Sequence, residues 1–330
     1  MEEVQAKIES MAFKGYGVAR IDGQVVFIPQ SVTGDRGWIK IIEKRKAYSI
    51  GKLITLIEPS PFRVEPPCSL FGQCGGCQWQ HIDHSVQINL KKEILTEVLK
   101  RLGRLKEIPP LTTAPSTQSY GYRARAQLKV KGETMGFFQE RSHRIANIDH
   151  CPISHPLINQ IISSLQKELP FFPRIEEIEV NVSPEEGKGI LILHPLSSHQ
   201  GMNHLVQDLL KTHPILRGIA VVRGNGFTFF GDPYLSFTIS SNRFGERRKL
   251  SLRTSPQSFY QVNLEQNHTL IQTVLEFSDV NEDEKVLDLY AGIGNFTLPL
   301  AIASKEVAGI EENHWAVEDA TLNAERNGVK

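Results

Sequence analysis

Three cysteines stand close together in the stretch CSLFGQCGGCQWQH, which covers residues 68–81. Cys68, Cys74 and Cys77 are joined in the chain by one other cysteine, Cys151, in the stretch HCPISH. Thiolates are soft ligands that suit zinc and iron–sulfur clusters. A structural zinc usually takes two C-x2-C knuckles, whereas three clustered cysteines and a remote fourth are more typical of a cubane cluster. The spacing therefore favours an iron–sulfur cluster over zinc, with ordinary buried thiols as a third alternative.

A second candidate site is the stretch KVLDLYAGIGNF, in which a predicted strand runs into Gly292 and Gly294. Glycines at such a turn let the backbone pass close to a nucleotide-like ligand at a helix N-terminus. Glu311 follows the next apolar run, at the place where a carboxylate binds ribose hydroxyls. The dinucleotide fingerprint has a third glycine or alanine where this chain has Thr297. The pattern therefore favours S-adenosylmethionine (SAM) over NAD.

The chain that positions these residues reads as three segments. Residues 1–58 have short β-rich runs between turn signals, as in a small barrel of the OB or SH3-like size. Residues 59–255 alternate strand-like runs with amphipathic helices, which predicts an α+β domain. Residues 256–330 begin with a helix and continue as one βαβ unit of a Rossmann-like sheet. The helices predicted before that unit cover residues 85–102, 155–169, 202–213 and 258–280.

Basic residues gather locally, although Lys plus Arg equals Asp plus Glu at 37 each. The first run consists of Arg36, Lys40, Lys44, Arg45 and Lys46. Two interpretations stay open for it: a solvated strand face, or an RNA-contacting barrel, since such barrels combine a basic groove with exposed strands. The second run consists of Arg243, Arg247, Arg248, Lys249 and Arg253. Two interpretations also stay open for this second run: a further RNA-facing patch or a solvated loop.

The composition argues against several classes of protein. A chain of 330 residues with 40% hydrophobic and 22% charged residues is typical of a soluble globular protein of about two or three domains. Its apolar runs are far shorter than the roughly 20 residues of a membrane span, and MEEVQAKIES has no apolar core of a secretory signal. Four cysteines in such a chain argue against a disulfide scaffold. We therefore expect a protein of the reducing cytoplasm without membrane contact, and no feature implies a protein partner.

Taken in order, the motifs resemble those of one family, the SAM-dependent RNA uracil-C5 methyltransferases, and specifically its bacterial 23S rRNA branch. The stretch KGYGVARIDGQVVFIP is similar to the TRAM domain, an OB-like RNA-binding module. CSLFGQCGGCQWQH with HCPI resembles the family's iron–sulfur signature, and SPQSFYQVN and LDLYAGIGNFTLPLA resemble its SAM-site motifs. The resemblance covers essentially the whole chain. It implies a multidomain protein with a TRAM barrel over 1–58, a central [4Fe-4S] domain over 59–255 and an incomplete SAM-dependent methyltransferase domain over 256–330.

The resemblance also implies roles for individual residues. The implied ligands of the [4Fe-4S] cluster are Cys68, Cys74, Cys77 and Cys151. The implied SAM contacts are Gln261, Tyr290 and Glu311, with Asn295 as a further candidate. Phe259 is implied as a stacking residue for the RNA, although a lone phenylalanine is more often core; likewise Gln261 also fits a helix cap and Tyr290 an ordinary core residue. The transfer RNA branch of the family lacks the TRAM and cluster segments, so the architecture favours 23S rRNA as the partner.

The family's chemistry needs two further groups. Because C5 of uracil is a poor nucleophile, a cysteine thiolate adds to C6 and makes C5 reactive toward the methyl group of SAM. A glutamate then removes the C5 proton, after the base has been swung out of its stack. In the family these two residues lie beyond the second strand of the SAM-binding domain, and all four cysteines here are already assigned to the cluster. We therefore assign no catalytic residue in this chain, and we expect an N-terminal fragment that does not itself methylate.

Two other functions stay open from the sequence. One is a non-catalytic iron–sulfur protein that binds RNA; a stop codon directly after Lys330 would favour it over the leading interpretation. The other is a NAD-linked iron–sulfur oxidoreductase, which Thr297 and the absence of a second redox motif disfavour. We expect the cluster to have a structural and RNA-positioning part, because its surroundings contain no motif for a reductase partner or for radical chemistry.

Overall fold

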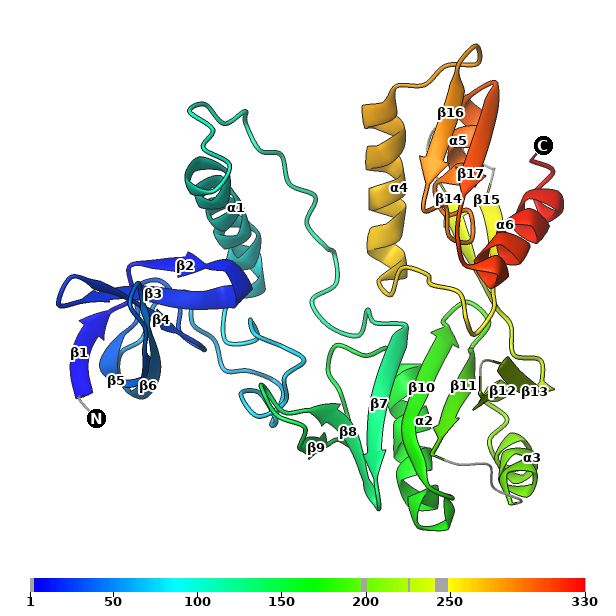
Figure 1. Cartoon of the computed structure of the whole chain (residues 1–330), viewed down its shortest axis with the longest axis horizontal. Coiled ribbons are helices and arrows are strands. Elements are labelled where there is room, and N and C mark those ends of the chain that lie inside the picture. The colour runs from blue at the N-terminus through cyan, green and yellow to red at the C-terminus, as the bar shows by residue number, and fades with distance from the viewer. Residues whose placement is uncertain (1–2, 197–200, 225, 241–248, 330) are drawn as a thin grey trace. The chain divides into compact units, whose positions relative to one another are not determined.

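The computed structural model describes residues 3–196, 201–224, 226–240 and 249–329 (Figure 1). The chain divides into two compact units. The first unit consists of Met1–Pro115 and Phe138–Ala146, and the second of Ser116–Phe137 and Asn147–Lys330. The division of the sequence into three domains stays a prediction. No helix of the described residues is long and apolar enough to cross a membrane.

The first unit is built on one sheet, as the short β-rich runs of its sequence predict. The six-stranded sheet has the order β1-β5-β6-β4-β3-β2. Its strands are β1 (Glu3–Lys7), β2 (Ser10–Ala12), β3 (Tyr16–Ile21), β4 (Gln24–Ile28), β5 (Arg36–Lys44) and β6 (Ser49–Glu58), with the 3-10 turn η1 (Phe13–Gly15) after β2. Ile8, Ile28 and Ile39 are fully buried in one cluster of the core. The strands predicted within residues 1–58 are therefore confirmed.

A buried ion pair joins the turn after β4 to the chain that leaves β6. Asp35 is fully buried, and its carboxylate accepts hydrogen bonds from the backbone amides of Val32 at 2.8 Å and Ser60 at 3.0 Å. Arg63 donates to both oxygens of Asp35, through Nε at 3.0 Å and through Nη2. Burial raises the pKa of Asp35, but the bonds from Arg63 and the two amides outweigh it, so the pKa lies below its usual value.

The cysteine segment and one helix complete the first unit. Tight turns follow Cys68, since the amide of Phe71 donates to the carbonyl of Cys68 at 3.0 Å. The helix α1 (His84–Arg101) begins where Asp83 accepts a hydrogen bond from the amide of Ser85. Leu90 packs in a cluster with the fully buried Ile82. The helix ends before Gly103, as the sequence predicts.

The second unit contains the strands β13-β12-β11-β10-β7-β8, in this order, of a mixed seven-stranded sheet that ends at β9. Its strands are β7 (Arg125–Lys131), β8 (Thr134–Phe138), β10 (Ile175–Ser183), β11 (Lys188–Pro195), β12 (Leu216–Arg223) and β13 (Gly226–Gly231), and the short β9 (Ile145–Asn147) follows β8. All neighbours in this order are antiparallel except β11 and β12. The parallel pair is the one joined by a helix, as a crossover connection requires.

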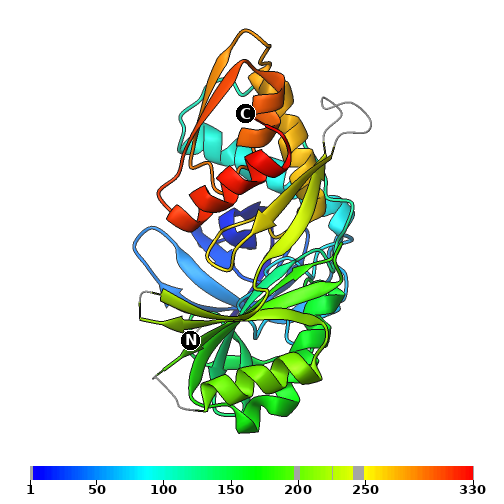
Figure 2. The ribbon, with the colours of Figure 1, turned by 90° about the vertical axis from the view of Figure 1, so that its right-hand side faces the viewer.

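Two amphipathic helices pack on one face of this sheet (Figure 2). They are α2 (Pro156–Glu168), followed by the 3-10 turn η2 (Leu169–Phe171), and α3 (Met202–Thr212). The buried faces carry Ile158, Ile161, Ile162 and Leu165 on α2 and Met202, Val206 and Leu209 on α3. The predicted helices over 155–169 and 202–213 are therefore confirmed to within a residue or two.

The C-terminal part of the second unit holds the predicted βαβ unit. The strands β16 (Lys285–Leu289) and β17 (Glu306–Ile310) pair in parallel, and α5 (Thr297–Ala303) connects them. The helix α6 (His314–Arg326) follows β17. An antiparallel pair, β14 (Leu235–Ser240) and β15 (Lys249–Thr254), precedes these elements, and α6 contacts β15. The glycine loop thus lies between a strand and a helix, as the sequence predicts.

The helix predicted over 258–280 starts later than expected. The helix α4 covers Leu264–Ser278, and the side chain of Asn263 caps it by accepting from the amide of Gln266 at 3.0 Å. The residues before it are not helical, and the end of this segment pairs with the chain that enters β7: Ala124 donates its amide to the carbonyl of Val262 at 2.8 Å, and Asn263 forms a bridge with Arg123. The prediction was therefore wrong for residues 258–263, since a pairing with a distant segment replaces the first helical turns.

Candidate functional site

The glycine loop adopts backbone conformations that explain its composition. Gly292 and Gly294 have φ angles of +55° and +91°, in the region that favours glycine. A Cβ atom on Gly294 would lie 2.2 Å from Cδ1 of Leu298, a buried residue of α5. A Cβ atom on Gly292 would meet nothing within 4 Å. Gly294 therefore allows close packing of the loop on α5, whereas the side of Gly292 is open for a ligand.

Glu311 closes the glycine loop from the end of β17. Its Oε2 accepts a hydrogen bond from the amide of Gly292, and its Oε1 accepts one from the amide of Asn313, both at 2.9 Å. These two backbone bonds, from Asn313 and Gly292, hold the pKa of Glu311 below its usual value. Glu311 is therefore a carboxylate at neutral pH. Because a carboxylate has about four acceptor positions, it retains capacity for ribose hydroxyls.

The two other residues predicted on this loop have different environments. Tyr290 is 87% exposed with a φ of +64°, so it is not an ordinary core residue. The side chain of Asn295 forms two hydrogen bonds with Asn267 of α4, at 2.7 and 3.0 Å. The side-chain amide of Asn295 thus fastens the loop to α4. Tyr290 remains the side chain that is exposed enough to contact a ligand.

The segment SPQSFYQVN lies beside this loop. Phe259 is 62% exposed, whereas the next residue, Tyr260, is buried and donates its hydroxyl to the carbonyl of Ala124 at 3.0 Å. Burial raises the pKa of Tyr260 above its usual value. Gln261 is half-buried in this extended segment, so it is not the helix cap. The interpretation of Phe259 as a core residue is therefore wrong, and the segment presents an exposed ring.

Asn313 connects this segment to the end of β17. Its Nδ2 donates to the carbonyl of Gln257 at 3.0 Å, and its Oδ1 accepts from the amide of Trp315 to cap α6. Its own amide is one of the two that bond Glu311. The structure therefore brings the motif around Phe259 and Gln261 next to the glycine loop and Glu311. The sequence analysis missed Asn313, whose position before a helix was its one local signal.

Arg36 and Lys40 of the first basic run lie on the outward face of β5, whereas Arg45 and Lys46 follow the strand. Residues of β5 alternate, so that Gly37, Ile39 and Ile41 point inward. The exposed Trp38 lies between Arg36 and Lys40 on the other face and pairs with Gln5 of β1. We call this surface the β5 patch; its members are Lys7, Arg36, Trp38, Lys40 and Lys52. Lys44 follows a register shift between Ile41 and Glu43 and pairs with the buried Ser49, so it does not belong to this face. The sequence analysis missed Trp38, which adds a ring to the predicted basic surface.

The charges of the β5 patch are partly paired at its edge. Lys40 lies 3.9 Å from Glu3, and Arg36 lies 3.6 Å from Glu58, both as exposed pairs that salt and solvent weaken. Arg45, which follows β5, bonds Glu43 at 2.6 Å and lies over the ring of Tyr48. The guanidinium of Arg45 therefore has closer partners within the protein than the ammonium group of Lys40 has.

The cysteines fall into both units. Cys68, Cys74 and Cys77 belong to the first unit and Cys151 to the second, and all four side chains are half-buried. The amide of Gly76 donates to Sγ of Cys74 at 3.4 Å. Such amide–sulfur bonds stabilise a thiolate and tune iron–sulfur clusters. The side chain of Asn159 holds Cys151 by bonding both its amide, at 2.8 Å, and its carbonyl, at 3.1 Å. Three of the four predicted cluster ligands therefore lie in the first unit and one in the second, and the [4Fe-4S] cluster stays a prediction.

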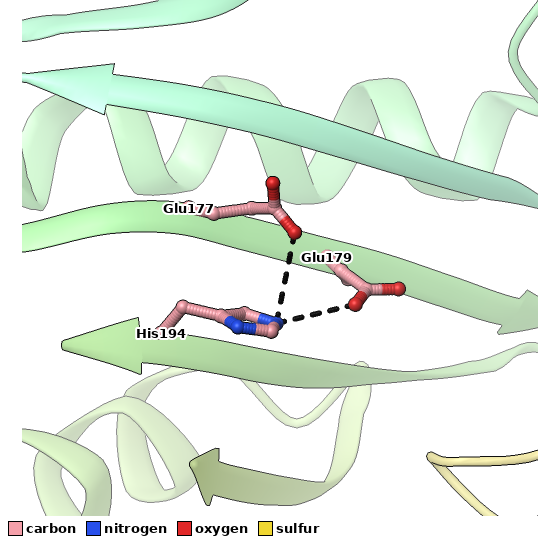
Figure 3. Close-up of side chains that lie close together, drawn as sticks. All are labelled: Glu177, Glu179 and His194. Carbon is pink, nitrogen blue, oxygen red and sulfur yellow. Dashed lines mark hydrogen bonds and ion pairs between the residues drawn. The ribbon is translucent and has the colours of Figure 1, made fainter. Parts of the chain in front are cut away.

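A charged group that the sequence analysis did not identify lies on the large sheet of the second unit. Glu177, Glu179 and His194 place their ligand atoms within 4.8 Å of one another (Figure 3). Arg125 bonds Glu179 at 2.6 Å, and Lys129 pairs with Glu177. A divalent cation would have to compete with these two cationic side chains. We therefore interpret this group as an ion-pair network.

The network makes a testable contribution to the pH dependence of stability. The bond to Glu179 raises the pKa of His194 above its usual value of 6.5. A raised folded pKa gives stability that is fully present below the unfolded pKa and is lost as the pH rises through the folded pKa. His194→Gln should therefore destabilise the protein by about 1 kcal/mol at a pH of about 5.5 and by much less at about 9. Thermal melts at both pH values measure the difference.

The matched control for this experiment is His204→Gln, because His204 is an exposed residue of α3. Its substitution measures the general effect of replacing an exposed histidine with glutamine at each pH. An equal effect of His194→Gln at acidic and alkaline pH would show that protonation of His194 does not contribute.

The second basic run is only partly described. Arg243, Arg247 and Arg248 lie outside the described residues. Arg253 is mostly buried and bonds the carboxylate of Asp319, and its guanidinium lies 4.2 Å from the centre of the Tyr234 ring. Arg253 therefore belongs neither to a solvated loop nor to an exposed RNA-facing patch, because its guanidinium is mostly buried and is bonded to Asp319 of α6.

The fold and the sites define the class of the protein. A parallel βαβ unit whose glycine loop is closed by a carboxylate is a Rossmann-like nucleoside-binding domain. A family profile described as tRNA (Uracil-5-)-methyltransferase matches residues 236–330, and the TRAM domain profile matches residues 1–54. The second unit thus carries a SAM-dependent methyltransferase domain, and the first a TRAM domain.

Similar proteins agree with this class over the whole chain. An uncharacterized RNA methyltransferase of Halalkalibacterium halodurans is 33% identical over 353 residues, which cover 98% of this chain and 75% of the relative. The 23S rRNA (uracil(1939)-C(5))-methyltransferase RlmD of Nitrosococcus oceani is 33% identical over 350 residues, which cover 100% of this chain and 74% of the relative. The chain belongs to the family of SAM-dependent RNA uracil-C5 methyltransferases.

A solved structure shows the same fold. The Pyrococcus abyssi tRNA (uracil-54, C5)-methyltransferase in complex with S-adenosyl-L-homocysteine aligns with a TM-score of 0.74 and 21% identity. The alignment covers 99% of this chain and 77% of that protein. A transfer RNA enzyme thus has the fold of the N-terminal segments too, so the inference of a ribosomal substrate from these segments alone was wrong.

Proposed function

We propose that this chain supplies the SAM-binding and RNA-binding parts of uridine C5 methylation in rRNA. The single observation that carries the proposal is the hydrogen bond from the amide of Gly292 to the carboxylate of Glu311. It holds an acid that can bind ribose hydroxyls beside the open side of the glycine loop. The family and the TRAM domain give the reaction and the class of partner. The ribosomal substrate is favoured by the relative RlmD, whose name states 23S rRNA.

SAM would supply the methyl group, and residues of this chain would hold and orient it. Glu311 would accept hydrogen bonds from the ribose hydroxyls, because its carboxylate is charged and fixed by two amides. Tyr290 would lie against the nucleoside, since its exposed ring stands at the end of β16. Gln261 is the third predicted contact. Asn295 would contact SAM through its backbone groups, because its side chain is bonded to Asn267.

The RNA would use two surfaces. The β5 patch combines Arg36 and Lys40 with the ring of Trp38, and basic strands with exposed rings bind single-stranded RNA through phosphates and stacking. Lys44 is a predicted contact on the other side of the same strand end. Phe259 would stack on a base next to the methyl donor, because its exposed ring belongs to the segment bonded to Asn313. Arg45 stays a weaker candidate since Glu43 neutralises it.

We also propose that Cys68, Cys74, Cys77 and Cys151 ligate a [4Fe-4S] cluster. The spacing in the sequence and the amide of Gly76 on Sγ of Cys74 support it. Iron and acid-labile sulfide analysis of anaerobically purified protein tests this assignment. About four irons per chain are expected, whereas a single zinc would overturn it. With the four thiolates in this role, we assign no residue of this chain as the nucleophile or the general base.

The test of the proposed function is a calorimetric titration of the 330-residue chain with SAM and with S-adenosyl-L-homocysteine. We expect one site, with both ligands competing, and no binding of NAD. The RNA arm measures binding of a 23S rRNA fragment against a transfer RNA transcript at fixed salt, because affinities for RNA depend on salt. Absence of SAM binding would contradict the cofactor site, and preference for the transfer RNA would contradict the ribosomal substrate.

Trp38 gives the RNA-binding surface a direct test. Trp38→Ala should weaken binding of the 23S rRNA fragment by about tenfold, because base stacking on an aromatic ring contributes about 1–3 kcal/mol. Fluorescence anisotropy of a labelled fragment measures the change. The control is Phe277→Ala, which removes another exposed ring at the end of α4. An equal loss in both variants, or none in either, would remove the β5 patch from the RNA-binding surface.

A further inference from the structure

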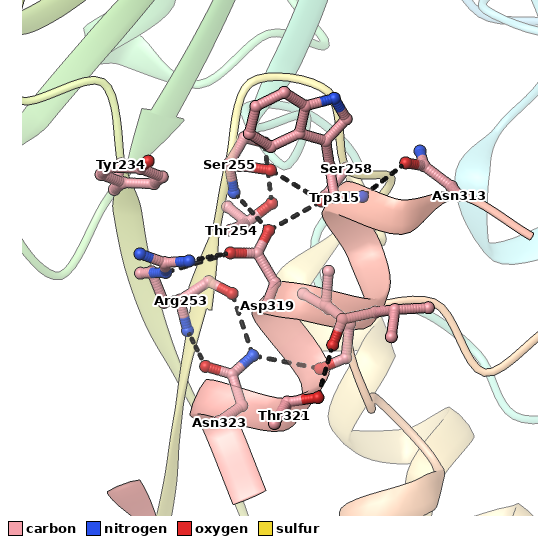
Figure 4. A network of polar contacts seen from close by, with 12 residues as sticks. Tyr234, Arg253, Thr254, Ser255, Ser258, Asn313, Trp315, Asp319, Thr321 and Asn323 are labelled. Carbon is pink, nitrogen blue, oxygen red and sulfur yellow. Dashed lines mark hydrogen bonds and ion pairs between the residues drawn. The ribbon is translucent and has the colours of Figure 1, made fainter. Parts of the chain in front are cut away.

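A fully buried carboxylate joins α6 to the segment that precedes Phe259 (Figure 4). Oδ1 of Asp319 accepts hydrogen bonds from Nε and Nη2 of Arg253, at 3.0 and 2.7 Å. Oδ2 accepts from the amide of Ser255 and from Oγ of Ser258, both at 2.7 Å. Both oxygens of Asp319 are therefore satisfied, and the guanidinium balances its charge.

The bonds of Asp319 fix the shape of a turn. The amide of Ser258 donates to the carbonyl of Ser255 at 3.1 Å, and the two hydroxyls lie 2.8 Å apart. Phe259 follows the turn directly, and Gln261 comes two residues later. Within the turn, the carbonyl of Gln257 accepts a bond from Asn313. The chain that leads to Phe259 is thus held both by α6 and by the residue that caps it.

The next turn of α6 holds the glycine loop. Oδ1 of Asn323 accepts from the amide of Arg253 at 2.8 Å, and its Nδ2 donates to the carbonyl of Arg253 at 3.0 Å (Figure 4). The same Nδ2 donates to the carbonyl of Ile293, between the two glycines, at 3.1 Å. Side chains of α6 therefore bond the glycine loop, β15 and the Ser255–Ser258 turn, and so fix the positions of these three segments relative to one another.

We propose that Asp319 is a positioning residue, which fixes Phe259 and Gln261 relative to the glycine loop so that base and methyl donor meet in one geometry. This inference rests on the proposed function. A buried ion pair is a weak means of stabilising a fold, because desolvation offsets much of the attraction. Its four directional bonds do fix geometry, and a misplacement of about 1 Å costs about a hundredfold in a reaction that depends on orientation. The placement of the turn, more than stability, explains why the carboxylate is there.

The test is Asp319→Asn in the full 330-residue chain. The asparagine side chain keeps the shape of the aspartate but loses its charge. Its amide nitrogen would face Arg253 or Ser258, so the Ser255–Ser258 turn should loosen. We expect the dissociation constant for SAM to rise about tenfold or more, as loss of charged hydrogen bonds predicts. We also expect faster cleavage by chymotrypsin after Phe259, followed by mass spectrometry, with unchanged cleavage after Phe171, which is 78% exposed in η2.

Two further variants separate positioning from stability. Leu165→Ala removes a fully buried side chain of α2 and destabilises the same unit outside the network. Ser258→Ala removes one bond to Asp319 and keeps the ion pair, so it should give a smaller change in both readouts without unfolding. If Leu165→Ala weakens SAM binding as much as Asp319→Asn at an equal loss of melting temperature, positioning is overturned. Unchanged cleavage after Phe259 in folded Asp319→Asn also overturns it.

The proteolysis readout keeps this inference apart from the proposed function. If the unchanged chain does not bind SAM, the cofactor site fails, while the cleavage rate after Phe259 still decides whether Asp319 holds the turn.

Discussion

Replacing Glu311 with glutamine is expected to weaken SAM binding by about 10- to 100-fold, the range that loss of a charged hydrogen bond gives. The carboxylate bonds two amides and offers its remaining acceptor positions to the ribose. The amide side chain of glutamine keeps one acceptor oxygen and puts a donor against a backbone N–H, so it loosens the glycine loop and loses the charged contact. Calorimetry with SAM measures the effect.

The matched control is Glu312→Gln, because Glu312 is the adjacent carboxylate and is exposed. It changes the net charge equally and should leave the affinity for SAM within about twofold of the unchanged chain. Equal affinities for the Glu311 variant and the unchanged chain would remove Glu311 from the cofactor site. Equal losses in both variants would point to a general charge effect.

Replacing Asp35 with alanine is expected to destabilise the first unit by about 3–5 kcal/mol, because it leaves Arg63 without its buried partner. Two backbone amides, those of Val32 and Ser60, also lose their acceptor. Hydrogen exchange followed by mass spectrometry on peptides of β5 and β6 measures the free energy in this unit separately from the other. Peptides of β10 and β11 in the second unit should keep their protection.

The control for Asp35 is Glu58→Ala, which breaks the exposed pair with Arg36 on the same sheet. This pair should contribute less than about 1 kcal/mol. The lowered pKa of Asp35 also predicts a pH dependence: its contribution is present above the unfolded value of 3.8 and is lost as the pH falls through the lower folded pKa. A loss in Asp35→Ala no larger than in Glu58→Ala would show that burial does not strengthen the Asp35–Arg63 pair.

The candidate site shows why some residues were predictable. Gly292, Gly294 and Glu311 stand at fixed spacings along one βαβ unit, and a strand, a turn and a helix are set mainly by neighbouring residues. The same holds for the cysteine segment, whose three cysteines lie within ten residues. Such patterns are local, and the chemistry follows from the residue types.

Other residues were missed because their partners are distant in the sequence. Arg253 looked like part of an exposed basic run, yet its partner Asp319 lies 66 positions away. The start of α4 moved to Leu264 because Val262 pairs with Ala124. Trp38 reads as an ordinary strand residue until the register places it on the outward face between Arg36 and Lys40.

The sequence therefore determined the family, most of the strands and helices, the βαβ unit with its glycine loop and the set of candidate ligands. It did not predict the pair β14 and β15 or the start of α4. The tertiary structure decided which charges are buried, which rings are exposed and which helix holds the segment around Phe259. The reason is physical: spacing along the chain specifies local backbone geometry, whereas burial and charge pairing depend on contacts such as Asp319 with Ser258, which are 61 positions apart and form when the chain folds.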